Sequence, residues 1–265
     1  MNIIMKQLAL ALLLSMPSLH AQESMKFLGV HKGEILNTGS ASIYNNFAFS
    51  KVHNNTQLFL SMTNKFGLKN LNQIAIAYSK PRENKILGIG YQFDEEGNWL
   101  KHHLKTAIQM NYSERWYFAP SLNLFFKSLT YPESSSSFNA SISFGIAYIQ
   151  NPNLKFGLQS SNFAINNQDI SKFEIAPSLQ YSFEQNLHFG LEAIIQNNPS
   201  TINTKLSALL LVDTKKSLYM NYSLLGNYFT LGISISQASF NWSLLLSHHP
   251  SLDYSSSIEI NKFWP

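Results

Sequence analysis

The chain has 265 residues, with 19 basic and 15 acidic side chains and no cysteine. Charged residues make up 13% of it, about half the share found in soluble domains. Polarity comes instead from 35 Ser and 27 Asn. The absence of cysteine excludes disulfides, thiolate metal sites and a cysteine nucleophile. The net charge of +4 is small and dispersed, which argues against a nucleic-acid-binding protein.

The first 21 residues have the three-part form of a secretory signal peptide. Residues 1–6 carry one positive charge, residues 8–16 are apolar apart from one serine, and residues 19–21 end in alanine. The apolar run is too short to span a bilayer. We therefore expect cleavage after Ala21 and export of the remaining chain, with a buried N-terminal helix as the alternative.

Beyond this segment, apolar side chains recur at every second position, which is the period of β-strands. From residue 138 to 148 the even positions hold Phe, Ala, Ile, Phe, Ile and Tyr, and the odd positions hold Asn, Ser, Ser, Gly and Ala. Residues 173–183, 229–236 and 240–247 alternate in the same way. Alternation alone fits a soluble β-sandwich as well as a membrane barrel.

Three details favour a transmembrane barrel over a periplasmic sandwich. The alternating segments run about nine to twelve residues, which a tilted strand needs to cross a bilayer, whereas soluble strands average about five or six. The polar partners are mostly small, as in a polar lumen. Aromatic residues such as Tyr112, Trp116, Tyr148 and Trp264 recur at segment ends, where they form interfacial girdles in membrane barrels.

The pattern predicts an all-β fold, a transmembrane antiparallel up-and-down barrel of about fourteen strands over residues 56–265. The expected strands are residues 56–64, 71–78, 85–93, 101–112, 116–129, 138–149, 154–160, 173–183, 187–195, 202–212, 218–224, 228–236, 240–247 and 254–264. Connections alternate between short turns and mostly longer loops, as periplasmic turns and outer loops do. Two connections break this rule mildly: residues 79–84 are long for a periplasmic turn, and residues 226–227 are short for an outer loop. If two strands are assigned wrongly, the barrel has twelve.

Residues 22–55 do not join the alternation, since they mix glycines and polar residues with a moderately apolar stretch at 43–49. Such a segment is either an exposed tail or a plug in the lumen. We expect a plug, because a ring of fourteen strands encloses a space that is either filled or open as a channel.

The last strand shows which face each position takes. Tyr254, Ile258, Ile260 and Trp264 share one parity and are expected to face lipid, while Glu259 faces the lumen. Lys262 also has the outward parity, so it is expected near the headgroups, where its stem can snorkel. The strand must close the ring against residues 56–64, because an open edge cannot persist in hydrocarbon.

Seven titratable side chains share the polar parity of their segments and are predicted to face the lumen: Lys105, Lys127, Glu174, His188, Glu192, Lys205 and Glu259. None of them forms a recognisable catalytic or metal-binding pattern. The adjacent pairs His102–His103 and His248–His249 point to opposite faces of a strand, so neither pair can chelate one ion. Residues 94–96, Asp-Glu-Glu, read as a solvated outer loop. We therefore expect a protein that is not an enzyme and that has no cofactor or bound metal.

Residues 64–71 (NKFGLKNL), followed by residues 75–81 and 87–91 (LGIGY), resemble a Bacteroidota outer-membrane barrel family. That family is related to PorV and PorQ of type IX secretion and, more distantly, to the FadL fatty-acid transporters. Segments 156–158, 229–235 and 247–250 agree in order. One departure is that residues 50–55 read SKVHNN where such proteins often carry Asn-Pro-Ala-Gly. The resemblance implies a fourteen-stranded barrel in the bacterial outer membrane and no single activity.

Two functions follow as hypotheses. The first is a structural or accessory subunit of an outer-membrane assembly, in protein secretion or barrel-assembly machinery, suggested by the resemblance and by the short loops. Its partners would be outer-membrane lipids, lipopolysaccharide and other proteins of the complex. The alternative is a FadL-like transport barrel for small hydrophobic compounds, suggested by the polar lumen and the expected plug.

Overall fold

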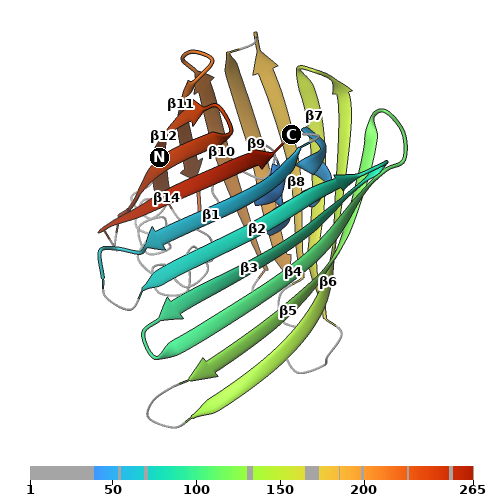
Figure 1. Ribbon diagram of the computed structural model, residues 1–265. Coiled ribbons are helices and arrows are strands. Elements are labelled where there is room, and N and C mark those ends of the chain that lie inside the picture. Colours follow the sequence, from blue (N-terminus) through green and yellow to red (C-terminus); the bar gives the residue numbers. More distant parts are fainter. Residues whose placement is uncertain are drawn as a thin grey trace, which may run out of the picture.

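In the computed structural model, the described residues are 39–52, 55–68, 71–129, 134–164, 173–184, 186–197, 200–225, 227–250 and 253–264 (Figure 1). They form a closed barrel of fourteen antiparallel strands, preceded by two short 3-10 helices. The prediction of an all-β antiparallel barrel is confirmed, with fourteen strands and not twelve. The expected signal peptide lies outside the described residues. No helix among these residues is long and apolar enough to cross a membrane.

The elements follow one another without any crossover between non-consecutive strands, except where the last strand meets the first. They are η1 (Gly39–Tyr44), η2 (Phe47–Val52), β1 (Thr56–Asn64), β2 (Asn72–Arg82), β3 (Lys85–Glu96), β4 (Trp99–Asn111), β5 (Trp116–Leu129), β6 (Ser135–Asn151), β7 (Leu154–Ala164), β8 (Glu174–Phe183), β9 (Leu187–Asn197), β10 (Ser200–Leu211), β11 (Lys216–Ser223), β12 (Tyr228–Gln237), β13 (Phe240–His249) and β14 (Asp253–Trp264).

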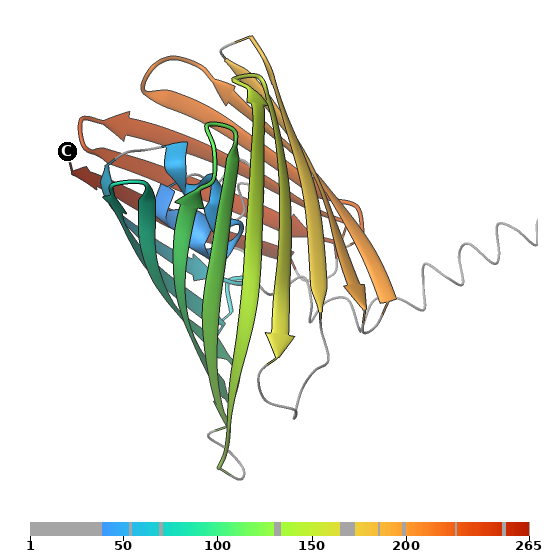
Figure 2. The ribbon, with the colours of Figure 1, turned by 90° about the vertical axis from the view of Figure 1, so that its right-hand side faces the viewer.

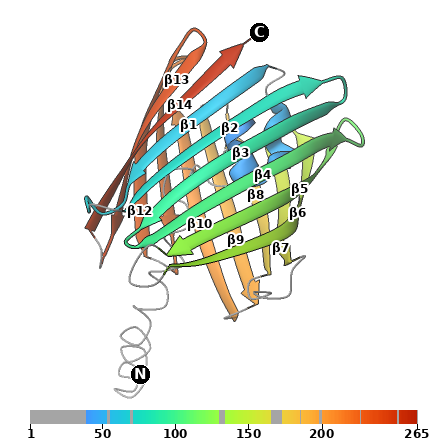
Figure 3. The ribbon, with the colours of Figure 1, turned by 60° about the horizontal axis from the view of Figure 1, so that its bottom comes forward.

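The ring closes between β14 and β1, which lie side by side in Figure 3. Their pairing runs from Thr56 opposite Trp264 to Asn64 opposite Ser256. The predicted closure and the bounds of β1 are therefore confirmed.

One predicted connection between β2 and β3 is wrong. Residues 79–84 do not form a long turn, because β2 continues to Arg82 and pairs with β3 until Arg82 lies opposite Lys85. Only Glu83 and Asn84 remain between the two strands, and Glu83 takes a positive φ of 50°. Pro81 and the charges beside it suggest a loop, yet pairing with β3 extends the strand. Each pair of strands joined at this end, which we call the short-turn end, is thus connected by only two to four residues.

The two faces of the wall are inverted relative to a soluble protein. On β6, Ile142 and Phe144 are 36% and 47% exposed on the outer surface, while the neighbouring Ser141 and Ser143 are buried inside. The same alternation of exposed apolar and buried small polar side chains runs along β12 and β13. An apolar exterior around a polar interior is the pattern of a barrel that lies in lipid.

Adjacent leucines on β13 test these faces. Leu244 is 57% exposed, whereas Leu245 is buried inside against Gly232 and Tyr219. We expect Leu244→Arg to cost about 2–4 kcal/mol in a bilayer and Leu244→Ala to cost little. Leu245→Ala is expected to cost about 2–3 kcal/mol because it leaves a cavity. Urea unfolding in lipid vesicles measures these costs, and equal losses for the two alanine variants would contradict the assignment.

The barrel wall is uneven in height. Strand β6 has 17 residues and β5 has 14, whereas β11 has only 8. Figure 2 shows the β5–β6 hairpin extending farthest at the end opposite the short turns.

Candidate functional site in the barrel interior

Residues 39–52, which we call the inner segment, lie inside the barrel (Figure 2). Ser40, Ser42, Ile43 and Asn46 have no exposed surface. The plug predicted for residues 22–55 stays a prediction in its extent, because residues 22–38 lie outside the described part of the chain.

Two side chains of the inner segment hydrogen-bond to the wall. The Asn46 amide nitrogen donates to the carbonyl oxygens of Ile146 on β6, at 3.1 Å, and of Leu158 on β7, at 3.2 Å. Its own amide oxygen accepts from the backbone N–H of Ala48 at 3.1 Å. The Asn46 amide group therefore donates to two carbonyl oxygens of the barrel wall and accepts one hydrogen bond from the backbone of the inner segment.

Tyr44 makes the corresponding contact with β2 and β3. Its hydroxyl lies within hydrogen-bond distance of the carbonyl oxygens of Ile76 on β2 and Tyr91 on β3, which face each other in the pairing of these strands. Burial raises the pKa of the Tyr44 phenol above its ordinary value, so it stays a donor. The inner segment is therefore anchored to two pairs of neighbouring strands.

Glycines in the wall allow this close approach. A Cβ on Gly88 would lie 2.4 Å from the Phe47 ring, and one on Gly145 would lie 2.3 Å from the Asn46 amide oxygen. Gly90 and Gly157 are in similar contact with Ile43 and Phe49. A side chain at any of these positions would force the inner segment away from the wall.

The inner segment also creates an apolar region in an otherwise polar lumen. Its apolar side chains pack against Phe59, Tyr117 and a set of wall alanines. The members of this cluster from the inner segment are Ala41, Ile43, Tyr44, Phe47, Ala48 and Phe49, and the wall alanines are Ala75, Ala77, Ala107, Ala119 and Ala147. Small wall residues leave room for the aromatic rings of the inner segment.

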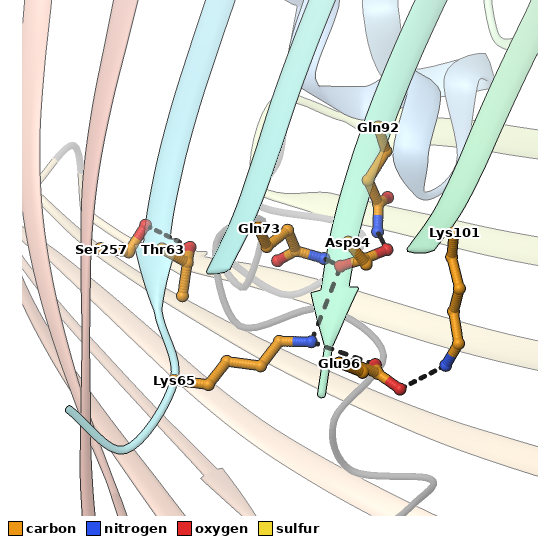
Figure 4. A network of polar contacts seen from close by, with 8 residues as sticks. All are labelled: Thr63, Lys65, Gln73, Gln92, Asp94, Glu96, Lys101 and Ser257. Atoms are coloured by element: carbon orange, nitrogen blue, oxygen red, sulfur yellow. Dashed lines mark hydrogen bonds and ion pairs between the residues drawn. The ribbon is translucent and has the colours of Figure 1, made fainter. Parts of the chain in front are cut away.

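A charged network lies at the end opposite the short turns (Figure 4). Lys65, directly after β1, is fully buried, and its ammonium lies 3.6 Å from Asp94 and 3.4 Å from Glu96. Glu96 also bonds Lys101. Gln73 and Gln92 each donate to one oxygen of Asp94 at 2.6 Å. The network ties the outer ends of β1, β2, β3 and β4 together.

This network was missed from the sequence. The interpretation of residues 94–96 as a solvated loop is wrong, because Asp94 is 8% exposed and the segment belongs to β3. Gln73 and Asp94 have the inward parity, which was the available signal. Lys65 directly follows the strand predicted at residues 56–64 and continues the inward parity of Ser61 and Thr63, which was the signal for its burial.

The structure does not gather the seven predicted lumen residues into one site. It places one pair together, with Lys205 on β10 opposite Glu192 on β9 and 3.6 Å between their charged groups. Glu259 is buried on the inner face of β14.

The remaining four are dispersed around the wall. Lys105 reaches the Asn45 carbonyl of the inner segment at 3.5 Å, and the Lys127 ammonium lies 3.7 Å from the centre of the Trp99 ring. Glu174 accepts from Gln196 on β9 at 3.0 Å. His188 shares a hydrogen bond with Ser182 at 2.7 Å. Roles for these side chains stay predictions.

In the described part of the chain, no group of three or more His, Cys, Asp or Glu side chains lies where it could hold a metal ion.

No family model and no curated protein sequence matches the chain. Solved structures do match it. The Ralstonia pickettii toluene transporter TbuX matches with a TM-score of 0.65 at 9% identity, covering 86% of this chain and 94% of TbuX. The CymD monoaromatic hydrocarbon channel matches with a TM-score of 0.60 at 11% identity, covering 85% and 93%. The Pseudomonas putida toluene transporter TodX matches with a TM-score of 0.57 at 10% identity, covering 85% and 92%.

The fold is that of these hydrocarbon transporters. At these identities the likeness concerns the fold alone. It agrees with the distant resemblance to FadL-type barrels seen in the sequence, whereas the nearer resemblance to PorV and PorQ stays a prediction.

Proposed function

We propose that the protein is an outer-membrane barrel that transports small hydrophobic compounds. The observation that carries this proposal is the apolar region formed by the inner segment inside a closed wall. Apolar side chains at this place in a polar lumen would favour a small apolar solute over a polar one, because an apolar solute gives up no hydrogen bonds when it leaves water.

The fold likeness supports the same function, since the similar structures are a toluene transporter from each of two bacteria and a monoaromatic hydrocarbon channel. The apolar exterior supports a membrane location, and a closed barrel is one of the two structures that satisfy every backbone group within lipid. In the orientation usual for such barrels, the short-turn end faces the periplasm.

Uptake of radiolabelled toluene by cells that produce the protein tests the proposal. We expect uptake above that of cells with an empty vector. Phe47→Gln places an amide in the apolar region and should lower uptake about tenfold, because an unpaired polar group there costs roughly 1–3 kcal/mol. Phe47→Leu keeps the region apolar and is the matched control.

Uptake that is equal with and without the protein would overturn the proposal, as would equal uptake by the two Phe47 variants at equal amounts of folded barrel. Stoichiometric purification with other outer-membrane proteins, together with no uptake, would instead favour an accessory subunit.

A further inference from the structure

The exterior at the short-turn end carries lysines that no transport function requires. Lys80, Lys85, Lys216 and Lys262 each lie at the end of a strand, on the same parity as exposed apolar side chains of that strand. Lys80 follows Ile76 and Tyr78 along the outer face of β2, for example. Their stems therefore lie along the lipid-facing surface, with the ammonium groups beyond it.

These lysines lie on one side of the barrel. The strands that carry them, β2, β3, β11 and β14, fall within seven consecutive strands of the ring, from β11 through β14 and β1 to β3. We call this set of four residues the lysine belt.

Pairing places tryptophan between two members of the belt. Lys216 lies opposite Ile235, which lies opposite Trp242, and Trp242 lies opposite Ile260. On the next row, Lys262 lies opposite Phe240, with its ammonium 3.8 Å from the centre of that ring and 5.8 Å from the centre of the Trp264 ring. Aromatic rings beside lysine stems mark the headgroup level of a bilayer.

The charge on the outer face differs between the two ends. Among the described strand positions that face outward at the short-turn end there is no Asp or Glu, and the acids of this end lie in its turns at Glu83, Glu114, Glu184 and Asp213. At the opposite end the described outward strand positions include Glu95 and no Lys or Arg. The Lys101 and Lys127 side chains of that end have the inward parity and are held by Glu96 and Trp99.

We propose that the lysine belt binds the phosphate groups of anionic phospholipids, such as phosphatidylglycerol, in the leaflet around the short-turn end. A lysine whose stem lies along apolar surface reaches the headgroup level, where its ammonium pairs with a phosphate. Anionic lipids hold basic side chains near a membrane surface in this way. The inference rests on the membrane location in the proposed function and does not depend on transport.

Three of the four tryptophans report on this leaflet. Trp116, Trp242 and Trp264 are 42%, 46% and 39% exposed on the outer face of the short-turn end, whereas Trp99 has the inward parity at the other end. Quenching of tryptophan fluorescence by brominated lipids therefore measures which lipids surround the belt. The purified barrel is reconstituted in phosphatidylcholine with increasing brominated phosphatidylglycerol or brominated phosphatidylcholine.

We expect phosphatidylglycerol to bind about three- to tenfold more strongly than phosphatidylcholine, and less so in 0.5 M salt. Replacing the four lysines of the belt by glutamine should lower the ratio, with the outward Arg82 of β2 left as the remaining basic side chain beside them. Glutamine keeps a long stem and a hydrogen-bond donor while it removes the charge. Lys101→Gln with Lys127→Gln is the matched control and should leave the ratio unchanged.

Equal binding of the two lipids to the wild type overturns the proposal, as does the same ratio in the belt variant and the wild type. If the fourfold variant does not fold, the pairs at β2–β3 and at β11 and β14 are replaced separately, and each should lower the ratio. Toluene uptake by the belt variant should equal that of the wild type, so a failure of the transport proposal is seen separately.

Discussion

Removal of residues 261–265 is expected to abolish assembly of the barrel. Asn261 and Trp264 lie opposite Phe59 and Thr56 of β1, so the deletion unpairs the start of β1 where the ring closes. It also removes the hydrogen bond from the Phe263 N–H to the Ser239 carbonyl at 2.8 Å. The deletion leaves an open strand edge at the headgroup level, where the ring must close before the strands enter the hydrocarbon. Each backbone group left unpaired below that level would cost several kcal/mol, because no water is available there to replace the partner.

Migration on cold gels with and without boiling measures this effect. The wild type should migrate faster before boiling, because a closed barrel resists detergent until heated, while the truncated chain should migrate identically in both cases. Deleting Pro265 alone leaves the pairing of β14 and β1 intact and is the control. A truncated chain that keeps its heat-modifiable form would show that these four pairs are not needed for closure.

Asn46→Asp should release the inner segment from the wall. Aspartate keeps the oxygen that accepts from Ala48 but replaces the two donors on Ile146 and Leu158 by an acceptor. Two wall carbonyls then face an oxygen at a fully buried position, which costs about 2–5 kcal/mol. The barrel itself should remain folded, because the strand pairing of β6 and β7 does not include this side chain.

Conductance in planar bilayers and limited proteolysis detect the release. We expect larger and more frequent openings for Asn46→Asp than for the wild type, together with faster cleavage near residue 46. Asn45→Asp is the matched control, since its side chain is half-buried and the Lys105 ammonium contacts its backbone carbonyl. Unchanged conductance and cleavage in Asn46→Asp would mean that the rest of the inner segment holds it in place.

The fold could be predicted because the alternation of apolar and polar residues is a local property of the sequence. Alternation at period two placed β1 at its observed bounds and separated the outward Ile142 from the inward Ser143 with no knowledge of neighbours. The same rule failed at Pro81, where pairing with β3 extends β2 through residues typical of a turn.

The side-chain contacts of the interior were harder to predict, because they join segments that are distant in the sequence. Parity could assign Lys205 and Glu192 to one face, but only the register of β9 and β10 brings them together. The contacts of Asn46 are about a hundred residues away in the chain, and nothing near residue 46 indicates them. The ion pairs of Lys65 could not be predicted for the same reason, since its partners come from the end of β3.

Because the strands differ in length, the rim of the barrel opposite the short turns is higher on one side than on the other. The nine-residue difference between β6 and β11 corresponds to about 30 Å measured along the strands. The outermost residues of β6, Ser135–Ser137, are exposed and polar, so that part of the wall stands in water and not in lipid. In the proposed transport function, a solute that arrives from outside would therefore reach the lumen more directly over the short β11 than over the tall, polar outer end of β6.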